Sequence, residues 1–204
     1  MRGWLRTRTA WWALLALGFL PLAWLVWRTW AEQLGANPAE TLIRATGDWT
    51  LRGLCLTLVV TPLRVMLGLP ELLRFRRLLG LLTFAYACLH LLCYAGFDMG
   101  FEWTDIVHDI PKRPFALVGA LAFALLVPLA ATSWNGAIRR LGARRWQALH
   151  RSVYAIAVLA VLHFWWMRAG KRNFTEVWVY GLILGGLLGW RILRACTAHE
   201  PARG

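Results

Sequence analysis

The sequence predicts an all-α fold, an integral membrane bundle of six transmembrane helices with both termini in the cytoplasm. Hydrophobic residues make up 59% of the 204-residue chain and charged residues only 16%, which is unlike an ordinary soluble domain. Several apolar runs approach or exceed the ~18–20 residues that a helix needs to cross a bilayer. Arg and Lys also concentrate in alternate connectors, as the positive-inside rule describes.

The apolar runs follow one another with polar or basic connectors between them. The first run resembles a signal peptide, but it is long, rich in Trp and not followed by a small-residue cleavage site, so we expect it to be retained. Pro62 lies in the second run and is expected to kink or thin its inner end. The spans are predicted at about residues 10–27, 50–69, 78–97, 115–131, 147–167 and 176–193.

The charges of the connectors set the predicted orientation. With the N-terminus inside, inner regions hold 14 of the 23 Lys and Arg residues, Arg151 adds a fifteenth, and the outer side holds eight. Acidic residues lean outward, mainly in the connector after the first span and in the polar loop 98–114. The segment SWNGAIRRLGARRW at 133–146 is predicted as an inner basic loop or short interfacial helix, and the basic loop RAGKRN at 168–173 is the one local exception.

The net charge of +13 suggests nucleic acid only for a soluble chain. Arginines that flank membrane helices produce the same excess, and no basic module with aromatic residues is present, so we expect membrane lipid and no nucleic acid as a partner. The four cysteines form neither a CxxC pair nor a CxxCH motif, which excludes covalent c-type heme attachment and makes a disulfide framework unexpected.

Three of the five histidines lie in or at apolar runs. His90 sits inside FAYACLHLLCYAG, residues 84–96, and His150 and His163 lie on the fifth predicted span, whereas His108 and His199 are expected at the surface. An ionisable side chain within a span is costly and indicates a functional site by default. The alternative for a single histidine is a neutral imidazole hydrogen-bonded to a neighbouring helix.

His90 and His163 are predicted at similar depth. Both lie near the outer ends of outward-running helices, and at ~1.5 Å rise per residue their heights differ by roughly 5 Å. Two such imidazoles can clamp a metal ion or a heme iron from opposite sides. A bare transition-metal site takes three or four ligands, often with carboxylate or thiolate. The apolar surroundings here favour a heme, which in the absence of CxxCH is b-type.

His150 precedes His163 by 13 residues, so on one continuous helix it lies ~20 Å deeper and on a different face. It is a candidate ligand of a second, inner heme, with no obvious intramembrane histidine as its partner. It is equally a candidate interfacial residue, or part of a flavin or donor-docking site. The neighbouring Arg151 is a candidate partner for a heme propionate or a phosphate, or an arginine that reaches the membrane surface.

Four stretches together resemble a known family: GDWTLRGLCLTLVVTPLR at 47–64, RRLLGLLTFAYACLHLLCY at 76–94, DIPKRPFALVG at 109–119 and RRWQALHRSVYAIAVLAVLHF at 144–164. In this order and spacing they resemble the heme-binding membrane subunits of bacterial protein-methionine-sulfoxide reductase systems, within the ferric-reductase-like transmembrane domain family. The resemblance covers roughly residues 40–190. It implies a heme-binding domain over 46–194, after an N-terminal helix and outer connector over 1–45 and before a cytoplasmic tail over 195–204.

The resemblance further implies a multi-pass cytochrome of the bacterial inner membrane. Such a protein takes electrons from a cytoplasmic flavin reductase or the quinone pool and passes them through heme b, one or two per chain, with FMN as a further cofactor. The acceptor is a periplasmic molybdopterin-containing subunit that reduces methionine sulfoxide in proteins. His90, His150 and His163 fall on the family's histidine positions.

Three alternatives stay open from the residues alone. The first is a cytochrome b that serves another acceptor, such as ferric iron, oxygen or a different periplasmic oxidoreductase. The second is a histidine-lined transporter, which is expected to show broken helices, inverted repeats and intramembrane acids. The third is a membrane subunit that binds no cofactor and would be colourless. Whether the chain is itself an enzyme is left undecided, because sulfoxide reduction is expected in the partner subunit.

Overall fold

The computed structural model describes residues 2–169 and 174–197, and these residues are helical with no β-strand. Six helical segments in this part of the chain are long and apolar enough to cross a membrane, as predicted, so the protein is a multi-pass membrane protein. The spans are Arg8–Trp30, Pro38–Leu67, Pro70–Asp98, Pro114–Ala131, Ala143–Ala169 and Thr175–Thr197. The RAGKRN loop from residue 170 on and His199 lie outside the described residues.

The individual helices subdivide these spans. Short α1 (Arg2–Leu5), α5 (Trp103–Asp109) and α7 (Asn135–Leu141) lie in the connectors, and α4 (Leu73–Cys93) is flanked by the single turns η1 (Pro70–Leu72) and η2 (Tyr94–Asp98). The remaining helices are α2 (Arg8–Trp30), α3 (Pro38–Leu67), α6 (Pro114–Ala131), α8 (Ala143–His150), α9 (Val153–Ala169) and α10 (Thr175–Thr197).

The second span begins at Pro38, about three turns before the predicted start. The Asn37 side chain accepts a hydrogen bond from the backbone N–H of Glu40, and Pro38 fills the first helical position, so a strong N-terminal cap starts the helix inside the polar connector. Asp48 therefore lies within the helix that forms the second span. Pro62 lies inside α3, which continues to Leu67.

The fifth span is two helices rather than one. The helical pattern of i to i−4 hydrogen bonds gives way at Ser152 and Tyr154 to bonds three residues back, to Leu149 and Arg151, and this tight turn separates α8 from α9. The predicted rotation between His150 and His163 assumed one continuous helix, so it does not apply. The predicted basic segment 133–146 forms α7 and the start of α8, so its last residues belong to this span.

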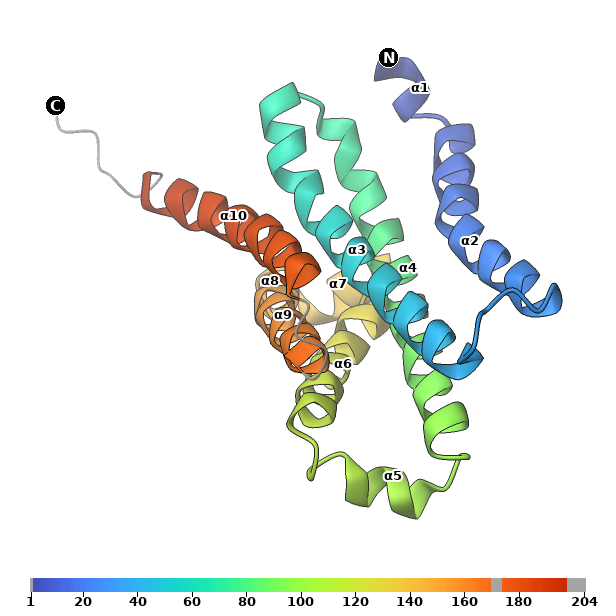
Figure 1. The fold of residues 1–204 in the computed structure, drawn as a ribbon. Helices are drawn as coiled ribbons and strands as arrows, with labels where there is room; N and C mark the ends of the chain where they lie inside the picture. The colour runs from blue at the N-terminus through green and yellow to red at the C-terminus, as the bar shows by residue number, and fades with distance from the viewer. Residues whose placement is uncertain (1, 170–173, 198–204) are drawn as a thin grey trace, which may run out of the picture.

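Two antiparallel hairpins form the centre of the bundle (Figure 1). One hairpin is α3 with α4 and the other is α6 with α9, while α10 packs along α9 and α3. The most deeply buried side chains at this junction come from α3, α9 and α10, namely Leu58, Ile156 and Leu184. Helix α2 lies at the edge of the bundle and is mostly exposed, as expected for a helix that faces lipid.

Candidate functional site

The imidazole rings of His90 on α4 and His163 on α9 face one another, one from each central hairpin. Their ring centres are 6.1 Å apart and their planes are nearly perpendicular, at 82°. Both rings are half-buried, and the ring of Phe115 lies 6.4 Å from that of His163. The structure therefore brings together the two histidines that the depth argument paired.

Each of these rings is held by a backbone carbonyl on the neighbouring helix. The Nδ1 of His90 lies 2.9 Å from the carbonyl oxygen of Ile43, and the Nδ1 of His163 lies 2.8 Å from that of Phe115. A carbonyl oxygen only accepts, so each Nδ1 carries the proton and donates it. In a neutral imidazole this leaves Nε2 with a free lone pair, which is the state that a metal ion requires.

The separation of the rings fits one metal ion between them. A metal–imidazole bond is about 2 Å long and the bonded nitrogen is about 1 Å from the ring centre, so two imidazoles on opposite sides of one ion have centres roughly 6 Å apart. The observed 6.1 Å agrees. Within the described residues no group of three or more His, Cys, Asp or Glu side chains could hold a metal ion. A two-histidine iron in a macrocycle fits this set better than a bare ion.

Charged side chains gather at the same end of α3, beside the residue that holds His90. Glu40, Arg44, Asp48 and Arg52 follow at four-residue spacing and so share one helix face. Arg44 pairs with Glu40 at 2.7 Å, and Arg52 donates to the Tyr180 hydroxyl at 3.0 Å.

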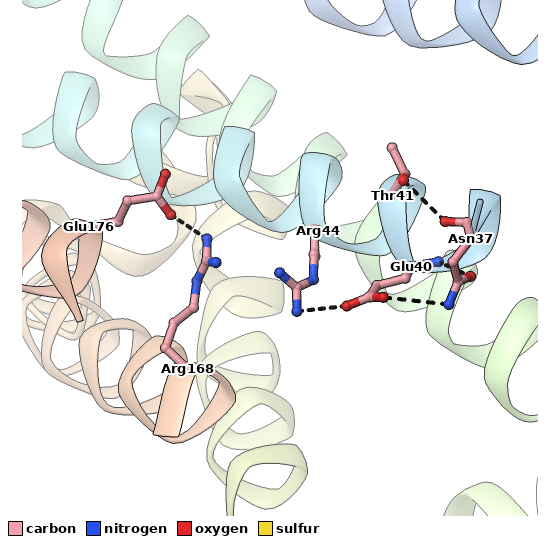
Figure 2. A network of polar contacts seen from close by, with 6 residues as sticks. All are labelled: Asn37, Glu40, Thr41, Arg44, Arg168 and Glu176. Atoms are coloured by element: carbon pink, nitrogen blue, oxygen red, sulfur yellow. Dashed lines mark hydrogen bonds and ion pairs between the residues drawn. The ribbon is translucent and has the colours of Figure 1, made fainter. Parts of the chain in front are cut away.

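Two further charged residues reach this face from the other side. Arg168 of α9 pairs with Glu176 of α10, and Figure 2 shows Arg44 and Arg168 directed into the space between α3 and the two later helices. Asp48 lies within electrostatic range of both arginines and of Glu176. The Nε atom of Arg44 is buried and has no hydrogen-bond partner among the described residues. The cluster thus contains guanidinium groups able to hold an anionic substituent.

His150 lies in a different setting, and no histidine among the described residues pairs with its ring. Its ring stacks on Trp146, with centres 3.9 Å apart, and its Nε2 lies 3.0 Å from the Thr132 hydroxyl. That hydroxyl donates its proton to the Pro128 carbonyl at 2.7 Å, so it accepts from His150, and Nε2 of His150 carries the proton. In this arrangement the lone pair of His150 is on Nδ1.

The other predicted positions are simpler. Arg151 is exposed in the turn between α8 and α9, and His108 is exposed on α5, as expected. All four cysteines, Cys55, Cys88, Cys93 and Cys196, are free in the structure. Sequence reasoning missed the carbonyls of Ile43 and Phe115, the Thr132–Trp146–His150 contact and the charged face of α3. Of these features, only the charged face of α3 is visible in the sequence, as charged residues spaced four apart.

Known proteins are similar to this chain over most of its length. Residues 46–161 match the family model described as "Ferric reductase like transmembrane component", which includes His90 and His150 and ends two residues before His163. A curated heme-binding subunit MsrQ of protein-methionine-sulfoxide reductase, from Polaromonas naphthalenivorans, is 63% identical over 85% of this chain and 79% of its own length. The chain belongs to the MsrQ family.

Other members of the family are similar over comparable lengths. The MsrQ protein of Herminiimonas arsenicoxydans is 50% identical over 89% of this chain and 84% of its own length. The MsrQ protein of Bordetella pertussis is 48% identical over 93% of this chain and 92% of its own length. No solved structure matches the chain.

Proposed function

We propose that this chain is a membrane b-type cytochrome that delivers electrons to an enzyme repairing methionine sulfoxide in proteins. The observation that carries the proposal is the His90–His163 pair, whose ring centres are 6.1 Å apart and whose Nδ1 protons are held by backbone carbonyls, so that both Nε2 lone pairs would be available to one iron. The names of the curated relatives, heme-binding subunits of protein-methionine-sulfoxide reductase, supply the ligand and the reaction.

The residues of the site have different roles in holding this cofactor. Bound heme supplies a one-electron iron couple. His90 and His163 would hold the iron through their Nε2 atoms, and their carbonyl partners fix the ring orientation and the tautomer. Arg44 and Arg168, which pair with Glu40 and Glu176, would offer guanidinium groups to the heme carboxylates. The apolar helices exclude water and keep the dielectric constant low around the iron.

The route of the electrons belongs to the proposal as well. We place the chain in the bacterial inner membrane with both termini in the cytoplasm. There it accepts electrons from a flavin reductase or quinone and passes them to a periplasmic molybdopterin-containing subunit. Four exposed arginines offer a surface for the donor, for the phosphate of FMN or for anionic lipid: Arg139, Arg140, Arg144 and Arg145. Sulfoxide reduction takes place in the partner, and this subunit performs electron transfer only.

The experiment follows electrons through the purified protein. The reduced chain in detergent is mixed with the periplasmic catalytic subunit and an oxidised, methionine-sulfoxide-containing protein, and oxidation of the heme is monitored by absorption. We expect oxidation only when both additions are present, and none with the sulfoxide-free protein. A heme that stays reduced with both, yet is oxidised by ferric iron or oxygen alone at a comparable rate, would contradict the proposed acceptor.

A further inference from the structure

The same local structure occurs twice, once around His90 and once around His163. In each central hairpin, the first helix carries a carbonyl that accepts from the histidine Nδ1, and the second helix carries the histidine. The carbonyl and the histidine are 47 residues apart in one hairpin and 48 in the other. Helices α3 and α6 are alternate spans and run in the same direction, so the two copies are parallel rather than inverted.

A glycine follows each of these carbonyls by four residues, one helical turn further on. It is Gly47 after Ile43 in α3, and Gly119 after Phe115 in α6. A Cβ atom at Gly47 would lie 3.0 Å from Cε1 and 3.1 Å from Nδ1 of His90. A Cβ atom at Gly119 would lie 2.9 Å from the same two atoms of His163. Each ring therefore lies directly against a backbone that has no side chain.

These contacts explain how the rings reach the helix backbone. A carbonyl inside a helix already accepts from the N–H four residues later, and side chains on the same face normally shield it. A glycine at that position removes the shield, so the imidazole can approach and donate a second hydrogen bond to the same oxygen. The ring cannot easily yield to a new methyl group, because its Nδ1 is tied to the carbonyl.

We propose that Gly47 and Gly119 are positioning residues that form a duplicated backbone cradle, which sets the orientation and the electron-donating strength of both axial histidines. The inference rests on the proposed function, because it concerns His90 and His163 as iron ligands. Neither glycine touches the iron. Each acts through the hydrogen bond that its missing side chain permits.

The physical consequence is a change in redox potential. A carbonyl that accepts the Nδ1 proton makes the imidazole a stronger donor, which stabilises ferric iron over ferrous iron. A methyl group at either glycine pushes the ring away, weakens this bond and is expected to make the midpoint potential more positive. Alanine is also the better helix former, so intrinsic helix propensity favours the variant rather than destabilising it.

The test uses the full chain with heme, carrying Gly47→Ala or Gly119→Ala. The readouts are the midpoint potential from a spectroelectrochemical titration and the g-values of the ferric EPR spectrum. We expect a positive shift in potential and altered g-values in both variants, or loss of heme from a chain with wild-type helix content. Gly80→Ala and Gly181→Ala are matched controls, because their new Cβ atoms would meet side-chain atoms at the ordinary distances of 3.8 and 4.0 Å.

The outcomes separate this inference from the proposed function. Wild-type potentials and g-values in both variants would overturn the cradle and leave the cytochrome intact, and so would equal shifts in the two controls. A well-folded wild type without heme would overturn the proposed function itself. If Gly119→Ala does not fold, the looser site at Gly47 decides the question alone.

Discussion

Arg191 on α10 donates a hydrogen bond to the backbone carbonyl of Leu58 on α3. In a regular helix this carbonyl would accept from the residue four positions later, but that residue is Pro62, which has no N–H. Leu58 is fully buried, so the carbonyl has no access to water. A partly buried arginine on a neighbouring helix thus supplies the donor that the proline removed, as membrane proteins require.

This relationship predicts a coupled effect on stability. Arg191→Met leaves the Leu58 carbonyl unsatisfied and is expected to cost about 1–3 kcal/mol of stability, the usual penalty for a buried polar group without a partner. In a Pro62→Ala background residue 62 regains its N–H, so the same change should cost clearly less. Unfolding in detergent, followed by circular dichroism for all four chains of the cycle, measures the difference.

The control for this cycle is Arg194→Met, an exposed arginine on the same helix. Its replacement should have little effect in either background. Equal costs for Arg191→Met with and without Pro62 would show that Arg191 does not act through the Leu58 carbonyl.

The ring planes of His90 and His163 predict a specific EPR spectrum. They are nearly perpendicular, at 82°. Perpendicular axial imidazoles interact with different iron d orbitals and leave these nearly equal in energy, which gives a strongly anisotropic low-spin ferric signal. A frozen sample of the oxidised protein should show this large-g signal. A rhombic signal of the kind that parallel imidazoles give, assigned to this heme by its loss in His90→Ala, would contradict the ring geometry.

The charged face of α3 predicts a role for Arg44 in retaining heme. Its Nε is buried without a hydrogen-bond partner among the described residues, so in the proposed cytochrome it would be available to a heme carboxylate. A hydrogen bond to a charged group is worth about 1.5–3 kcal/mol. Arg44→Gln should therefore speed the transfer of heme to a soluble apoprotein acceptor by about tenfold to a hundredfold. Glu40→Gln removes the carboxylate that pairs with Arg44 but keeps the guanidinium, so heme loss there should stay near the wild-type rate.

The setting of His150 predicts that it is dispensable for the heme between His90 and His163. His150→Ala removes a ring stack on Trp146 and a hydrogen bond to Thr132. Neither contact involves His90 or His163. The low-spin spectrum of that heme should persist. The ratio of extracted heme to protein then shows whether His150 holds a second one: an unchanged ratio assigns His150 to structure or docking, and a lower ratio assigns it to a second site.

Most of the fold could be read from the sequence because span length and hydropathy depend on composition alone. The six spans were predicted on this basis, and the structure confirms them. The exceptions arise from local hydrogen bonds. The Asn37–Pro38 cap starts α3 inside a polar connector, and bonds three residues back split the fifth span after His150. Neither feature changes hydropathy, so a hydropathy pattern does not register it.

The pairing in the site was predictable, but its support was not. His90 and His163 were matched by depth, which follows from helix rise and direction. The donors and acceptors that orient them are the backbone atoms of Ile43 and Phe115, and a backbone carbonyl has no signature in the sequence. Gly119 carries a partial signal, since it is a glycine inside a predicted apolar span. Gly47 carries none, because it lies before the predicted start of the second span, and only the three-dimensional contact gives either glycine its meaning.

The most direct test of the account is a reduced-minus-oxidised absorption spectrum with heme extraction, on purified wild type and on His90→Ala and His163→Ala. We expect a low-spin b-type spectrum in the wild type, with the same heme component lost from both variants. A wild-type spectrum and heme content in either variant would contradict the pairing. A colourless wild type, well folded and purified from heme-replete cells, would contradict the cytochrome itself.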